Sequence, residues 1–280
     1  MNLLQEYIEK INRKRPLYMP YLTIGDPDRE LTVRFAVDII DAGADILELG
    51  IPFSDPTADG PVIEAAMVRS LSKEAFSMDL IFDTAEKIHK ERPLIPLVFL
   101  GYLNPILHYH NNGKMDSQSI ENSIQAFMKK CRSSGVQGIV IPDLPFDQPE
   151  SAFIQKYGKE YGVSQIMLIA PNTSDTRIRE ISRNCGGFVY YVTSMGVTGE
   201  RKTLPSNIKK NIAKVRKICK LPVFAGFGIS SPEHVKMLKN DVQGIIVGSL
   251  NHSTIQEYGD KSSEKLKEIT SNFMTELKKW

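Results

Sequence analysis

Eight short apolar segments alternate with amphipathic helical segments along this 280-residue chain. Such runs are typical of strands that are buried on both faces, and the helical stretches between them indicate parallel pairing. Because a parallel sheet needs helical crossovers and closure removes its edges, the sequence predicts an α/β fold, a single (β/α)8 TIM barrel over residues 1–280. The expected strands are residues 17–24, 44–49, 94–102, 138–141, 165–169, 188–192, 222–225 and 244–247.

An extra helix is expected before the first strand. Leu3, Leu4, Tyr7, Ile8 and Ile11 recur at helical spacing, which predicts an amphipathic helix that plugs or flanks the barrel. A hydrophobic content of 41% supports a large core but fits two domains as well as one barrel. The sequence shows no linker, and this favours one domain.

Several classes of protein are disfavoured by composition. A formal charge of +2 with 24% charged residues provides no basic stripe, so no nucleic-acid partner is expected. The first residues lack an apolar signal core and no stretch approaches ~20 apolar residues, so we expect a cytoplasmic chain. The three cysteines are scattered, which indicates buried thiols rather than a disulfide or zinc framework.

Residues 48–61 carry the clearest candidate for chemistry. Glu48 interrupts an apolar strand near its end, where desolvation would let it hold or take a proton near neutral pH. Asp59 lies on a Gly/Pro-rich loop and is expected to be wetter and to stay ionised, so the two acids would divide acid and base roles. The alternative is structural: Glu48 pairs with a basic residue, and Asp59 caps the helix that begins near Pro61.

The barrel topology predicts that other polar residues lie near this acid pair. The carboxyl ends of the strands face one mouth, so Tyr102, Asn104 and Asp143 should converge there with the acids. Glycines end the last two expected strands, where barrels commonly hold phosphate on backbone N–H groups. Those glycines are Gly226, Gly228 and Gly248, the last followed by Ser249. They could instead serve only tight turns, and the 196–202 segment could be a lid or a plain solvated loop.

What the chain lacks narrows the chemistry further. No strand end offers a lysine for a Schiff base, and no nucleophile elbow is present. His108 and His110 are the only close pair among five histidines and lie in a polar segment, so no metal site is expected. Cofactor-free proton transfer by Glu48 and Asp59 on a phosphorylated substrate is what remains.

Six segments in order resemble the tryptophan synthase alpha chain family. They are residues 21–27 (YLTIGDP), 48–61, 102–105 (YLNP), 141–145 (IPDLP), 196–199 (GVTG) and 226–230 (GFGIS). The similarity runs from the first helix to the last. Tyr21 stands where many relatives have Phe, and residues 111–122 are longer than the family norm and look like an exposed loop.

The resemblance implies retro-aldol cleavage of indole-3-glycerol phosphate to indole and glyceraldehyde 3-phosphate, without a cofactor in this chain. It implies that Glu48 is the acid/base, that Asp59 binds the indole N–H, that Tyr190 positions Glu48 and that Thr198 reaches Asp59 when a lid closes. The implied phosphate ligands are Gly199, Gly228, Gly248 and Ser249, and the implied indole pocket is Tyr21, Leu100, Val140, Leu168 and Phe227.

A partner is also implied, a pyridoxal-phosphate-dependent beta chain in an alpha2-beta2 assembly that receives the indole. The contact would lie at the barrel mouth and involve Asp55, Pro56, Tyr102, Asn104 and Pro105. Two alternatives stay open: a self-sufficient indole-releasing lyase of the same family, and a weakly catalytic allosteric activator of a partner.

Overall fold

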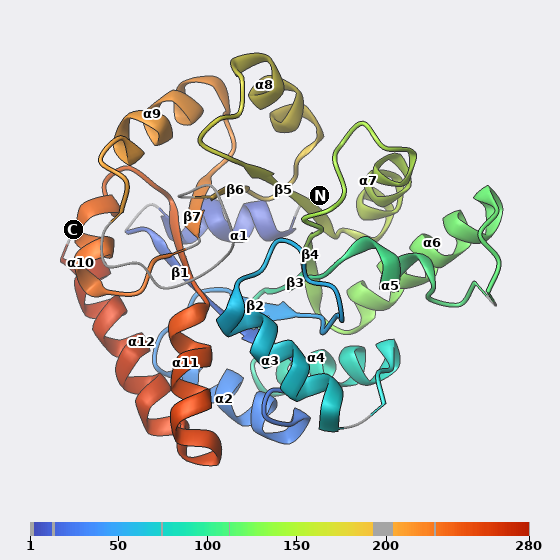
Figure 1. The fold of residues 1–280 in the computed structure, drawn as a ribbon. Helices are drawn as coiled ribbons and strands as arrows, with labels where there is room; N and C mark the ends of the chain where they lie inside the picture. Colours follow the sequence, from blue (N-terminus) through green and yellow to red (C-terminus); the bar gives the residue numbers. More distant parts are fainter. Residues whose placement is uncertain are drawn as a thin grey trace.

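Eight parallel strands close into a barrel in sequence order, which confirms the predicted TIM barrel (Figure 1). The computed structural model describes residues 3–12, 15–73, 75–111, 113–192, 204–226 and 228–279. The strands are β1 (Leu17–Thr23), β2 (Leu47–Gly50), β3 (Leu97–Leu100), β4 (Val136–Val140), β5 (Ser164–Ile169), β6 (Val189–Val192), β7 (Val223–Gly226) and β8 (Gly244–Val247). They are shorter than expected at several ends, because flanking apolar residues such as Ile46 are buried outside the paired segment.

Helices surround the barrel as an outer layer. The helices from the N-terminus to β4 are α1 (Leu3–Asn12), α2 (Arg29–Asp41), α3 (Pro61–Lys73), α4 (Met78–Glu91), α5 (Leu103–Leu107) and α6 (Ser117–Ser133). The later ones are α7 (Pro149–Tyr161), α8 (Asp175–Asn184), α9 (Ile208–Ile218), α10 (Pro232–Leu238), α11 (Ser249–Tyr258) and α12 (Ser263–Lys278), with a short 3-10 turn at Gly259–Lys261.

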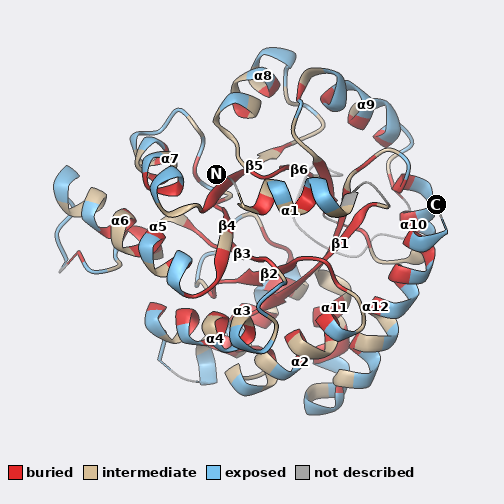
Figure 2. Ribbon diagram, turned by 180° about the vertical axis from the view of Figure 1, so that it is seen from behind, coloured by how far each residue is buried: buried red, intermediate tan, exposed pale blue. Residues whose placement is uncertain are grey.

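Side chains alternate between two cores along each strand, as the period of two requires. In β3, Val98 and Leu100 face the barrel interior, whereas Leu97 and Phe99 join the larger core between barrel and helices. The burial colours in Figure 2 show the strands mostly buried and the helices buried on one face only. The interior positions therefore hold few residues, and any polar one among them is conspicuous.

The expected first helix closes one end of the barrel. Leu4 and Ile8 of α1 are fully buried in the interior cluster with Phe188 and Phe224, at the end opposite to the mouth. Figure 2 shows α1 crossing in front of the strands at this end. Plugging this end leaves the opposite end of the barrel for a site.

Two segments differ from the sequence-based expectation. The sequence predicts a helical stretch that ends at about Glu91 before the third strand, whereas the structure has two helices there, α3 and α4, with the exposed Phe76 in the break. The predicted loop at residues 111–122 is only half irregular, because Asp116 caps α6 and Ser117 begins it. Asp116 accepts a hydrogen bond from the Ser119 N–H at 3.0 Å, the capping contact that starts this helix. Figure 1 shows the connection projecting from the rim of the barrel.

Candidate active site

Glu48 lies inside the barrel near the mouth. It is the inward residue of β2, in register with Tyr21 of β1 and Val98 of β3, and its exposed fraction is only 1%. Its Oε1 atom is buried without a hydrogen-bond partner in the part of the chain that the structure describes. Burial, and secondarily the charge of Asp59, raise the pKa of Glu48 to about 8. The salt-bridge alternative fails among the described residues, because no basic side chain there pairs with this carboxyl.

Asp59 is drier than predicted. The expectation of a solvated loop carboxylate is wrong, because only 5% of Asp59 is exposed, against 1% of Glu48. Burial raises its pKa to about 6, although a hydrogen bond from Tyr102 lowers it and the charge of Glu64 raises it further. The helix that follows begins at Pro61, which keeps Asp59 at the lip of the barrel, just before the N-terminus of α3.

Tyr102 holds Asp59 in this position. Its hydroxyl donates to Asp59 Oδ2 at 2.7 Å and accepts from the Ala58 N–H at 3.0 Å. Its ring stacks on Phe53 with centroids 5.1 Å apart, which joins the loop after β2 to the end of β3. The resemblance placed Tyr102 at a partner contact, but its side chain is 1% exposed and turned into the site. The alternation of Val98 and Leu100 in β3 was the signal that would have placed Tyr102 inward.

Two further tyrosines flank the acids. Burial raises the pKa of both hydroxyls, and the charges of Asp59 and Glu48 raise it further at Tyr21 and Tyr190 alike. Glycines on neighbouring strands make room for them: a Cβ at Gly50 would lie 2.0 Å from the Tyr21 hydroxyl, and one at Gly226 would lie 2.5 Å from the Tyr190 hydroxyl. Packing against Tyr190 therefore explains the glycine at position 226 without any role in phosphate binding.

The described residues of the expected indole pocket belong to one apolar cluster inside the barrel. Tyr21, Leu100 and Val140 are buried in the interior cluster, and the half-buried Leu168 packs against it. Phe227, the fifth predicted member, lies outside the described residues. Burial near the mouth of the barrel is the main cause of the raised pKa values of the two carboxyl groups.

The expected phosphate end lies at the last two strands. Gly248 precedes α11, and Ser249 is the first residue of that helix, so the backbone N–H groups of Ser249 and Leu250 have no intrahelical partner. Gly228 has a φ of 82°, a conformation that glycine adopts without strain. Thr198, Gly199 and the predicted lid at 196–202 lie outside the described residues.

The remaining predicted residues lie on the rim. Asp55 and Asn104 are exposed, and Pro56 and Pro105 are half-buried, so these four are accessible at the mouth. Asp143 accepts from the Leu103 N–H at 3.0 and 3.2 Å, which anchors the start of α5. Asp143 is thus a structural cap rather than a third acid of the site.

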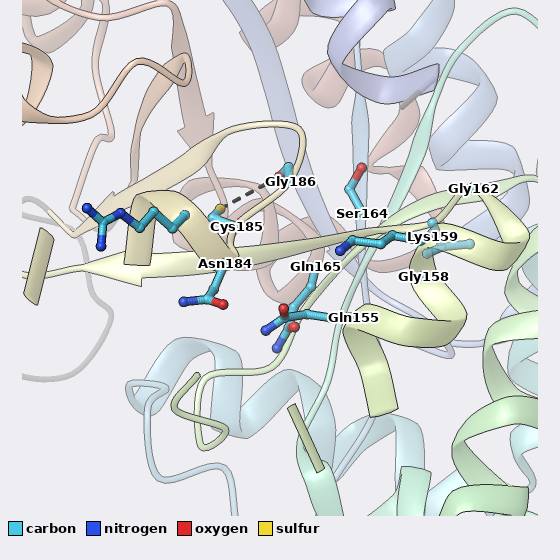
Figure 3. Close-up of a pocket in the computed structure, with 11 residues that line it drawn as sticks. Gln155, Gly158, Lys159, Gly162, Ser164, Gln165, Asn184, Cys185 and Gly186 are labelled. Carbon is cyan, nitrogen blue, oxygen red and sulfur yellow. Dashed lines mark hydrogen bonds between the residues drawn. The ribbon is translucent and has the colours of Figure 1, made fainter. Parts of the chain in front are cut away.

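A separate cleft of about 330 Å³ opens at the other end of the barrel (Figure 3). Its walls include Gln155 and Lys159 of α7, Gln165 of β5, and Asn184 and Cys185 at the end of α8. Burial raises the pKa of the Cys185 thiol to about 12, so this thiol stays protonated. No predicted site residue reaches this cleft, which lies at the face where TIM barrels do not carry their chemistry.

In the described ranges, no three His, Cys, Asp or Glu side chains gather closely enough to hold a metal ion. Nor, within those ranges, does any helix combine the length and apolar character needed to cross a bilayer.

A closed barrel with two buried carboxyl groups at its mouth defines a TIM-barrel protein with a candidate acid–base site. The family model described as tryptophan synthase alpha chain matches residues 8–279. The tryptophan synthase alpha chain of Leptospira interrogans is 43% identical over 246 residues, covering 88% of each chain. The chain belongs to the tryptophan synthase alpha chain family.

Solved structures agree with this membership. Tryptophan synthase subunit alpha from Legionella pneumophila superposes with a TM-score of 0.86 at 30% identity, over 100% of both chains. A chain of the tryptophan synthase complex from Pyrococcus furiosus superposes with a TM-score of 0.81 at 32% identity, over 94% of this chain and 99% of that one.

Proposed function

We propose that this chain cleaves indole-3-glycerol phosphate to indole and glyceraldehyde 3-phosphate by a cofactor-free retro-aldol reaction. The observation that carries the proposal is the acid pair, two buried carboxyl groups with pKa values of about 8 and about 6. At a pH between these values Glu48 holds a proton and Asp59 is charged. An acid and a base are therefore available in one apolar pocket.

Glu48 performs the proton transfers. Its carboxyl group donates a proton to C3 of the indole ring, and the resulting carboxylate takes the proton of the hydroxyl on the neighbouring glyceryl carbon. The bond between these two carbons then breaks, its electron pair returns to the ring, and the glyceryl carbon becomes an aldehyde. The buried setting of Glu48 supports this role, because burial favours the neutral acid that the first step needs.

Asp59 stabilises the charge that the first step creates. Protonation at C3 leaves positive charge on the indole nitrogen, and an ionised Asp59 accepts a hydrogen bond from its N–H. Tyr102 supports Asp59 by donating to Oδ2, which leaves Oδ1 for the substrate. In a site closed to water such charge stabilisation acts at low dielectric and is strong.

The other residues of the proposed site would bind the indole ring and the phosphate group of the substrate. The indole ring would lie among Tyr21, Leu100, Val140 and Leu168, with Tyr190 beside Glu48. The phosphate would bind at Gly228, Gly248 and Ser249, where the N-terminus of α11 favours an anion. Phe227, Thr198 and Gly199 are proposed partners of indole, Asp59 and phosphate on the resemblance alone.

The proposed partner is a pyridoxal-phosphate-dependent beta chain in an alpha2-beta2 assembly. The Pyrococcus furiosus relative was solved as a tryptophan synthase complex, and a second structure of it is titled as an a2b2 complex. Asp55, Pro56, Asn104 and Pro105 are proposed to contact the beta chain, because they lie at the accessible rim. Tyr102 would act beneath that contact, through Asp59.

The test is indole release from indole-3-glycerol phosphate by the purified chain, alone and with a stoichiometric beta chain. Slow release that the beta chain stimulates strongly is the expected result. Glu48→Gln, which keeps shape and hydrogen-bonding atoms but cannot transfer the proton, is the matched inactive variant. Fast release by the chain alone would replace the proposal with a self-sufficient lyase. No release under either condition would refute both.

A further inference from the structure

Three polar side chains meet behind the mouth and join α3 to α11. Asp26, on the loop after β1, accepts from Arg69 of α3 at 2.7 Å (Nε to Oδ1) and 2.9 Å (Nη2 to Oδ2). Nδ1 of His252 in α11 lies 2.7 Å from Asp26 Oδ2. The side chains of Asp26 and His252 are 0% exposed, whereas that of Arg69 is 28% exposed. We call Asp26, Arg69 and His252 the cross-helix triad.

The proton on the His252 ring is fixed by its neighbours. The Thr23 backbone N–H points at Nε2 with a nitrogen–nitrogen distance of 2.9 Å, and a backbone N–H can only donate. Nε2 is therefore the acceptor, and Nδ1 carries the proton that His252 donates to Asp26. Burial by itself would raise the pKa of Asp26, but the hydrogen bonds from His252 and Arg69 outweigh it and lower the pKa. His252 is thus a neutral imidazole that donates to the Asp26 carboxylate and accepts from the Thr23 backbone N–H.

The two helices that the triad joins begin at opposite ends of the proposed site. Asp59 lies two residues before the first residue of α3, and Gly248 directly precedes the start of α11. The two helices pack side by side (Figure 1). Arg69 lies about 12 Å along α3 from its first residue, at 1.5 Å per residue, while His252 lies in the first turn of α11.

The same part of α11 also holds the end of β1. Asn251 donates to the Tyr21 carbonyl at 3.3 Å, and the His252 ring meets the Tyr21 ring edge-on with centroids 5.5 Å apart. The Tyr21 hydroxyl in turn lies 3.1 Å from Thr23 Oγ1. His252 therefore lies in the first turn of α11 at the phosphate end and contacts the ring of Tyr21, the residue of β1 that is in register with Glu48 at the acid end.

We propose that the cross-helix triad sets the spacing between the acid end and the phosphate end of the site, with His252 as its positioning residue. The inference rests on the function proposed above and adds to it the groups that align the two ends. A substrate that spans both ends must satisfy both at once, and a misplacement of about 1 Å can cost roughly 10²-fold. A ligand that fills one end only is indifferent to the spacing.

A comparison of ligands that span both ends with ligands that fill one end therefore distinguishes a positioning role of His252 from general structural support. The experiment measures the dissociation constants of three ligands by calorimetry on the full chain: glycerol 3-phosphate, indole, and 3-(indol-3-yl)propyl phosphate. The third spans both ends and lacks the hydroxyl that cleavage requires, so it reports binding alone. The variants are His252→Phe, which removes both hydrogen bonds, and His252→Gln, which retains a donor and an acceptor. His89→Phe on the outer helix α4 is the matched control.

The expected result is that His252→Phe binds the spanning ligand roughly 10- to 100-fold more weakly and each fragment within about 2-fold of the wild type. His252→Gln restores most of the loss, and His89→Phe behaves as the wild type. If His252→Phe does not fold, Arg69→Gln carries the same test, since it opens the α3 side of the triad at its most exposed member.

Three results would overturn the inference. They are unchanged binding of the spanning ligand by a folded variant, an equal loss for fragments and spanning ligand, and failure of His252→Gln to recover binding. A wild-type chain that binds the spanning ligand no better than glycerol 3-phosphate would instead refute the proposed function, and the triad would have no two ends to align.

Discussion

Removal of the Tyr102 hydroxyl is expected to move one side of the pH profile and leave the other in place. If Asp59 acts ionised and Glu48 acts protonated, kcat/KM should be bell-shaped, falling below a pH of about 6 and above a pH of about 8. Tyr102 donates to Asp59 Oδ2 at 2.7 Å and so favours the charged form of Asp59. In Tyr102→Phe that donor is lost, and the pKa of Asp59 should rise.

The size of the shift follows from the type of hydrogen bond. A hydrogen bond to a charged group contributes about 1.5–3 kcal/mol, and each pH unit corresponds to about 1.4 kcal/mol. The acid limb of the Tyr102→Phe profile should therefore move upward by about one to two pH units, toward the alkaline limb. The bell narrows, and its maximum falls because fewer molecules hold one proton on Glu48 and none on Asp59.

The assay is indole release at low substrate concentration with saturating beta chain, from about pH 5 to about pH 9.5. Tyr109→Phe is the matched control, because the Tyr109 hydroxyl also donates to an aspartate, Asp79 at 3.0 Å, outside the site. Circular dichroism at each pH shows that the variants stay folded. An acid limb that stays in place in Tyr102→Phe would mean that this limb does not belong to Asp59, and the division of roles would have to be abandoned.

Three further predictions follow from burial and packing. Glu48→Gln and Asp59→Asn should each lower kcat by about 10²- to 10⁴-fold with unchanged circular dichroism, and near-normal turnover in either would remove that residue from its role. Glu48 keeps its proton in the folded chain up to a pH of about 8 but loses it in the unfolded chain near its ordinary value of 4.5, so its stabilising effect is complete below 4.5 and is lost as the pH rises through 8. In urea titrations, the free energy of unfolding of the wild type should therefore fall by up to about 5 kcal/mol relative to that of Glu48→Gln as the pH rises over this range. Parallel plots of the free energy of unfolding against pH for the two proteins would contradict the raised pKa. Gly50→Ala would put a Cβ 2.0 Å from the Tyr21 hydroxyl and should cost about 1–3 kcal/mol in the free energy of unfolding, whereas Gly259→Ala, with open space around it and a φ of 56°, reports only the backbone cost.

The fold was predictable because its signal is local and repeated. Each strand is a short apolar run that ends at a turn residue, and the β8 prediction of 244–247 coincides with the observed Gly244–Val247. The amphipathic spacing of Leu4 and Ile8 likewise predicted a helix with one buried face. The break between α3 and α4 was missed because apolar residues continue at helical spacing on both sides of it.

The surroundings of the site were less predictable, because they depend on contacts between distant segments. Asp26 and His252 are 226 residues apart in sequence, and nothing in either local pattern indicates that they touch. The burial of Asp59 has the same origin, since a loop rich in glycine and proline indicates exposure until Tyr102 and Phe53 are known to cover it. Sequence reasoning therefore found the two acids but assigned one of them the wrong environment.

The corrected environment changes how the acid pair divides its roles. The sequence suggested one dry and one wet carboxyl, yet both are buried and both pKa values are raised. What distinguishes them is hydrogen bonding: Asp59 receives a donor from Tyr102, while Oε1 of Glu48 receives none within the described residues. Burial pushes both groups toward the neutral form, the charge of Asp59 raises the pKa of Glu48 further, and the Tyr102 donor lowers the pKa of Asp59; together these effects separate the two pKa values of about 8 and about 6. The proposed acid–base function then depends on three side chains, Glu48, Asp59 and Tyr102, and a change that removes the Tyr102 donor should narrow the pH range in which Glu48 is neutral while Asp59 is charged, even with both carboxyl groups in place.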